Sequence, residues 1–190
     1  VDGRVTERTR WVGSVLDSAP GFMAEIRIDM DTWLKYHVAL LFPSLAPAMR
    51  AAGVDNYRLA RTRDLVVLAL RAMREGFRVL GSMGLPVTPA KFRVIQWLPE
   101  PILVLVLSRI LANPLMETAL VKHAEAARDE VQHLIGEFLV LARSTSVPTP
   151  TIDSLLRYYE PDPPQVPDGS AEIPLHWGGM IALFAAFALL

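Results

Sequence analysis

A single lysine interrupts an apolar helical run in the stretch Trp33-Leu34-Lys35-Tyr36-His37-Val38-Ala39. Lysine is scarce in this chain, because Lys35, Lys91 and Lys122 are the only lysines among nineteen basic residues. Arginine keeps its proton in proteins, whereas a lysine desolvated among apolar neighbours can release its proton near neutral pH. The position of Lys35 therefore indicates a candidate proton donor. The alternative is a lysine whose stem packs on apolar surface while its ammonium stays in water.

Helical spacing of apolar residues extends from this stretch in both directions, and prolines and glycines divide it into segments. Residues 22–28 have the composition of a short strand. The pattern predicts an all-α fold, a bundle of about six to seven helices with one short strand near the N-terminus. The expected helices cover about residues 6–16, 29–41, 57–83, 89–98, 102–111, 113–142 and 150–159.

The composition changes after residue 160. Residues 161–174 are rich in proline, aspartate and glycine, which is typical of a linker, and residues 175–190 are expected to form an apolar C-terminal helix. From Trp177 to the end this helix reaches about 21 Å, short of a bilayer core of about 30 Å. We therefore expect it to pack against its own bundle or a second copy of the chain. A truncated membrane anchor is the alternative, although we do not expect a membrane as partner.

Charge and composition exclude several classes of partner. The formal net charge of −1 gives no general attraction to nucleic acid or anionic membranes, and we expect no nucleic-acid partner. The absence of cysteine excludes disulfides and fits a cytoplasmic location. The lone Glu130-x-x-His133 pair lacks the second copy that helical di-metal sites need, so no metal site is expected. We interpret Arg71, Arg74 and Arg78 as a solvated helix face, with Glu75 paired to Arg71.

The order of these features resembles the C-terminal half of the ketopantoate reductase (2-dehydropantoate 2-reductase) family. Trp33-Leu34-Lys35 is similar to the family's Trp-x-Lys motif, and Asp129 to Gly136 resembles its Thr-Glu-Ile-Asp-x-x-Asn-Gly stretch. Val147-Pro148-Thr149-Pro150 matches the family's Val-Pro-Thr-Pro turn. The resemblance covers roughly residues 5–159. It implies a helical domain like the C-terminal domain of 6-phosphogluconate dehydrogenase, and a role in pantothenate biosynthesis.

The resemblance also implies a division into domains and a set of roles. Residues 1–28 look like the last helix and strand of a dinucleotide-binding Rossmann domain, and residues 29–160 like the helical substrate and dimerisation domain. Lys35 is then the general acid that protonates a 2-keto acid as it is reduced to a 2-hydroxy acid. Glu130 contacts the substrate hydroxyl or holds the lysine ammonium, and Thr118 takes the place of a substrate-binding serine.

Four positions depart from the family pattern. Where the family carries asparagines, this chain has Ala39, Phe42, Leu115 and Ile135. Apolar side chains cannot hydrogen-bond a polar keto acid. The substrate therefore either differs from the family's own or is not turned over.

The cofactor is a second departure. The chain holds no Gly-x-Gly-x-x-Gly after a strand, so NADPH is expected only with an N-terminal Rossmann domain, as if this chain were a piece of a longer one. The leading hypothesis is the C-terminal domain of an NADPH-dependent reductase, inactive as this isolated chain. Its partners are the Rossmann domain, a small 2-keto acid and a second copy in a homodimer. The first alternative is a catalytically silent helical dimerisation module, and the second is a membrane-anchored protein.

Overall fold

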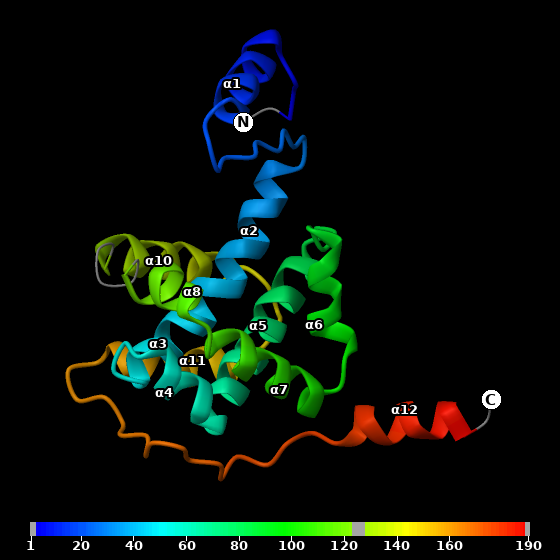
Figure 1. Ribbon diagram of the computed structural model, residues 1–190. Helices are drawn as coiled ribbons and strands as arrows, with labels where there is room; N and C mark the ends of the chain where they lie inside the picture. The colour runs from blue at the N-terminus through cyan, green and yellow to red at the C-terminus, as the bar shows by residue number, and fades with distance from the viewer. Residues whose placement is uncertain (1–2, 123–127, 189–190) are drawn as a thin grey trace.

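The computed structural model describes residues 3–122 and 128–188, and these form an all-α fold (Figure 1). The all-α class is therefore confirmed, in more and shorter helical segments than the six or seven expected. The α-helices are α1 (Glu7–Asp17), α2 (Met30–Leu40), α3 (Ala46–Ala51), α4 (Asn56–Arg61), α5 (Arg63–Ser82), α6 (Arg93–Trp97), α7 (Glu100–Leu111), α8 (Pro114–Met116), α10 (Arg128–Arg143), α11 (Pro150–Leu156) and α12 (Gly178–Ala188). Single turns of other helix types are η1 (Leu41–Leu45), η2 (Ala90–Phe92), η3 (Glu117–Lys122) and η4 (Arg157–Tyr159), of which η1 and η3 are π-helical. Residues 123–127 of the helix expected over 113–142 lie outside the described residues.

The strand expected at residues 22–28 is not formed. A strand needs a neighbouring strand to satisfy its backbone groups, and the described residues contain none. The Ala24 N–H is bonded instead to the carboxylate of Asp17, with an N–O distance of 2.6 Å. Residues 18–29 are an irregular connection between α1 and α2, and α1 stands apart from the bundle at the top of Figure 1.

Helix α5 is the centre of the bundle. Most of its residues are buried, and it packs against α2, α7, α11 and η1. The long helix expected over 57–83 is divided at Thr62, whose φ and ψ are −90° and 90°. The Thr62 hydroxyl donates to the Arg58 carbonyl at 2.8 Å and accepts from the Gly169 N–H at 3.2 Å, which holds the break in place.

At Gly76, α5 closely approaches both α2 and α10. A Cβ at this position would lie 3.1 Å from the Ala39 Cβ on α2 and 3.3 Å from the Phe138 ring on α10. Side chains at 76 and 39 must therefore stay small for the three helices to meet. This crossing fixes the spacing between α2 and α10.

An extended segment, here called the strap (residues 166–176), runs along the bundle (Figure 1). Its Glu172 and Ile173 N–H groups donate to the Asp64 carboxylate at 2.9 and 2.8 Å. Its His176 N–H donates to Glu100, whose side chain is 1% exposed and also accepts two bonds from Arg71. The segment expected as a linker (residues 161–174) is thus hydrogen-bonded to the buried Asp64, and His176, in the segment expected as an apolar helix, is bonded to the buried Glu100.

Helix α12 follows the strap and projects away from the bundle beside α7 (Figure 1). A Cβ added at Gly179 would lie 3.5 Å from Pro99, but Trp177, Ile181 and Phe184 stay exposed. Over the described ranges, no single helix has both the length and the apolar composition to cross a bilayer. In the same ranges, one pair of consecutive helical segments has that length and composition only when taken together. The pair is Glu100–Leu111 with Pro114–Val121, and the chain bends by 73° between them.

Candidate active-site cleft

A cleft of about 610 Å³ opens between α2 and α10, and both Lys35 and Glu130 line it. Helical spacing explains which residues of each helix line the cleft, because residues three or four apart share a helix face. On α2 and η1 the lining residues are Asp31, Leu34, Lys35, His37, Val38 and Phe42; on α10 they are Glu130, Leu134, Glu137, Phe138 and Leu141.

The Lys35 ammonium is paired with the Asp31 carboxylate one turn earlier on α2. The side chain of Lys35 is 33% exposed and that of Asp31 is 70% exposed. The apolar enclosure expected around Lys35 is therefore only partly formed. An ion pair this open contributes about 0–1 kcal/mol, so a ligand can displace Asp31 from Lys35 at little cost.

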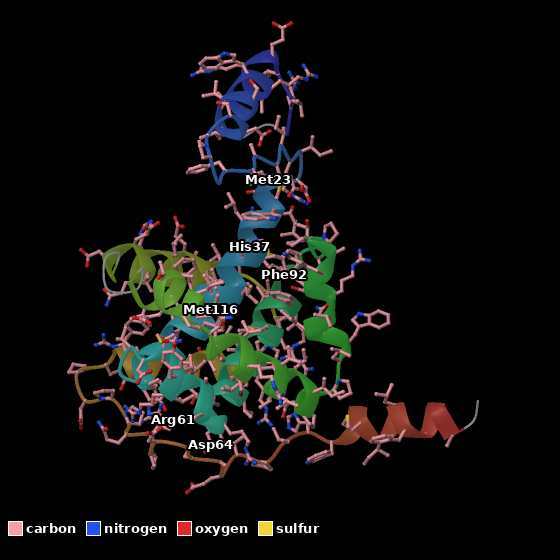
Figure 2. The ribbon with its side chains drawn as sticks, viewed as in Figure 1. Met23, His37, Arg61, Asp64, Phe92 and Met116 are labelled. Atoms are coloured by element: carbon pink, nitrogen blue, oxygen red, sulfur yellow. The ribbon has the colours of Figure 1, made fainter. Side chains whose placement is uncertain are left out.

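His37 lines the cleft, and its ring contacts the rings of Trp33 and Phe92. Figure 2 shows His37 near Phe92. Its Nδ1 is 2.7 Å from the Trp33 carbonyl oxygen, which can only accept, so Nδ1 carries the hydrogen. In the neutral ring Nε2 is then an acceptor. Stacking on Trp33, with ring centroids 3.5 Å apart, fixes the orientation of the ring.

Thr118 is not brought into the cleft. It is exposed on η3 and is absent from the lining residues. Its neighbours Ala119 and Leu120 line a separate apolar pocket of about 70 Å³. The substrate-binding role expected for Thr118 stays a prediction that this arrangement does not support.

The four positions that depart from the family pattern have different surroundings. Ala39 and Ile135 are buried, and Ala39 faces Gly76 at the helix crossing. Leu115 is exposed, and Phe42 lines the cleft. Of the four, only Phe42 contributes to the cleft wall, which makes that wall apolar where an asparagine was expected.

Sequence reasoning missed Asp31 and Glu137 as cleft residues. The available indication was their spacing, since Asp31 lies four residues before Lys35 and Glu137 seven residues after Glu130. Asp31 therefore shares a helix face with Lys35, and Glu137 shares one with Glu130, two of the residues that the sequence predicted for the site.

No metal or dinucleotide site is found in the described part of the chain. Over these residues no group of three or more histidine or acidic side chains could hold a metal ion. A dinucleotide needs a glycine-rich loop between a strand and a helix N-terminus. The glycine pair Gly178–Gly179 begins α12, but it follows an irregular segment in place of a strand, and a Cβ added at Gly179 would lie 3.5 Å from Pro99. The residues present do not fit the pyrophosphate of NADPH.

Taken together, these features define an all-α domain that presents a lysine and a glutamate from two helices to one cleft. The chain belongs to the ketopantoate reductase family: the family model described as "Ketopantoate reductase PanE/ApbA C terminal" matches residues 27–160. Lys35 and Glu130 fall within the matched range, whereas the strap and α12 lie outside it. Searches of curated proteins and of solved structures gave no match.

Proposed function

We propose that this domain forms the substrate-side wall of an NADPH-dependent reductase that converts a 2-keto acid to a 2-hydroxy acid. The observation that carries the proposal is the shared cleft of Lys35 and Glu130 inside the family-matched range. Lys35 is the proton donor, and Glu130 orients the ammonium or the substrate. A cytoplasmic location and a place in pantothenate biosynthesis belong to the same proposal.

The chemistry needs a cation where charge develops. Reducing a keto group builds negative charge on its oxygen, which an ammonium stabilises and then protonates. For Lys35 to do so, its Nζ leaves Asp31 and turns to the substrate oxygen. Glu130 on the facing helix then takes part in holding the ammonium in position.

The nucleotide comes from outside the described residues. Because these residues do not fit a dinucleotide, the proposal requires a Rossmann domain as partner and predicts that this chain alone is inactive.

The test mixes the chain with a separately produced nucleotide-binding domain of a ketopantoate reductase and follows NADPH absorbance with a 2-keto acid. We expect turnover only in the mixture, and a loss of at least about 100-fold in Lys35→Met, the usual contribution of a general acid. Lys91→Met is the matched control, since Lys91 is exposed and outside the cleft. Equal rates for Lys35→Met and the wild type in an active mixture would refute the assigned role.

A catalytically silent dimerisation module is the second candidate. The observation in its favour is apolar surface left exposed on α7 and α12, including Leu105, Ile110 and Phe184. Failure of any 2-keto acid to bind the chain would favour this candidate.

A further inference from the structure

The charges that line the cleft are unbalanced. Asp31, Glu130 and Glu137 bring three carboxylates, and Lys35 is the one lysine or arginine among the lining residues that the structure describes. A bound anion can therefore be neutralised at one point only. A second negative group on the same ligand would lie among like charges.

The rest of the cleft wall is apolar on both sides. Leu34, Val38 and Phe42 come from α2 and η1, and Leu134, Phe138 and Leu141 come from α10. Among the lining residues described, His37 is the one residue besides Lys35 and the three acids whose side chain can form a hydrogen bond. A hydroxyl or amide on the ligand that faces these apolar side chains, away from the carboxylates, would lose its bonds to water without replacing them.

We propose that the cleft selects 2-keto monocarboxylic acids with a bulky apolar side chain, branched aliphatic or aromatic. This inference rests on the proposed function, and it narrows the substrate class. The carboxylate and keto oxygens of such an acid both reach the Lys35 ammonium. These contacts replace the exposed ion pair between Lys35 and Asp31. The side chain then lies between the apolar faces of α2 and α10.

The size of the cleft agrees with this assignment. A volume of about 610 Å³ falls within the range of about 300–1,000 Å³ that small-molecule sites occupy. Apolar pockets discriminate by about 10- to 200-fold for each methylene group that a ligand lacks. Pyruvate, with a single methyl group, would leave most of the wall uncovered.

Isothermal titration of the full chain with four acids tests the inference. Pyruvate is the small apolar acid, ketoisocaproate and phenylpyruvate carry bulky apolar side chains, and oxoglutarate carries a second carboxylate. We expect the two bulky acids to bind at least about tenfold more tightly than pyruvate, and oxoglutarate to bind more weakly than either.

A charge reversal provides the matched variants. Glu137→Lys should strengthen oxoglutarate binding by about tenfold or more relative to ketoisocaproate, because it gives the second carboxylate a partner. Glu160→Lys changes the net charge equally at an exposed site outside the cleft and should leave this ratio unchanged.

The outcomes distinguish a failure of the apolar selectivity from a failure of the proposed function. If all four acids bind equally through Lys35, or the small and dicarboxylic acids bind more tightly, the apolar selectivity is wrong while the proposed function stands. If none of the acids binds, both fail. If the wild type prefers the bulky acids but Glu137→Lys leaves the ratio of oxoglutarate to ketoisocaproate affinity unchanged, the role assigned to the charge of the cleft is wrong.

Discussion

Lys35 on α2 and Glu130 on α10 line one cleft, although the central helix α5 and several others separate them in the chain. Their meeting depends on the crossing at Gly76, which brings Ala39 and Phe138 within contact distance of α5. The spacing of the two site helices is therefore a property of the core as well as of the cleft.

Enlarging Gly76 should disturb this crossing. In Gly76→Val the added carbons meet Ala39 and Phe138, and overpacking of this kind costs about 1–3 kcal/mol. We expect a lower melting temperature. Gly81→Ala on the same helix is the control, because a Cβ there meets no atom within 4 Å and should stabilise the helix by about 0.5–1 kcal/mol. Equal stabilisation by both changes would show that the crossing is not tight.

Removing the charge of Glu100 should loosen the strap. Glu100 is buried and accepts bonds from Arg71 and from the His176 N–H. Breaking such a buried pair costs about 3 kcal/mol, so Glu100→Gln should lower the melting temperature by roughly 6–12 °C. Asp168→Asn breaks the exposed pair with Arg61 and should cost at most about 1 kcal/mol. Similar small losses in both variants would contradict the assigned role of Glu100.

Acid should weaken the start of α2. Bonds from Arg27 and then from Thr88 lower the pKa of Asp29 from 3.8 to about 2. Because the folded pKa is below the unfolded value, the contribution of Asp29 to stability is complete above about pH 4 and is lost as pH falls through about 2. Denaturant unfolding from pH 2 to 5 should show a stability difference between wild type and Asp29→Asn that shrinks toward pH 2. A difference independent of pH would contradict this pKa.

Removing α12 should reduce self-association while the bundle stays intact. Ile181, Leu183 and Phe184 are exposed, and apolar patches of this kind promote association. A chain ending at Gly178 keeps the strap bonded to Asp64 and Glu100, so we expect an unchanged melting temperature and a smaller particle mass in light scattering. A chain ending at Pro161 is the contrast, since it also removes the strap and should melt lower. An unchanged particle mass on loss of α12 would exclude its role in association.

The helical class was accessible from the sequence because helical spacing points to it, whereas a common cleft for Lys35 and Glu130 was indicated by the family resemblance alone. The strand at 22–28 was wrong because local composition cannot supply a pairing partner. Spacing on one helix also misplaced Glu75, which accepts the Thr151 and Ile152 N–H groups rather than pairing with Arg71. These bonds join segments distant in sequence, and no local pattern records them. For the same reason, the linker-like composition of the strap did not indicate its hydrogen bonds to the bundle.

The most direct test of the central claim is a double-mutant cycle on ketoisocaproate binding, measured by isothermal titration. Wild type, Lys35→Met, Glu130→Gln and the double variant make up the cycle, with Lys91→Met as control. If both side chains act on one bound molecule, Lys35→Met weakens binding by at least about tenfold, and the two changes are non-additive by more than about 0.5 kcal/mol. Unchanged affinity in Lys35→Met, or strictly additive effects, would show that the lysine and the glutamate do not share a ligand.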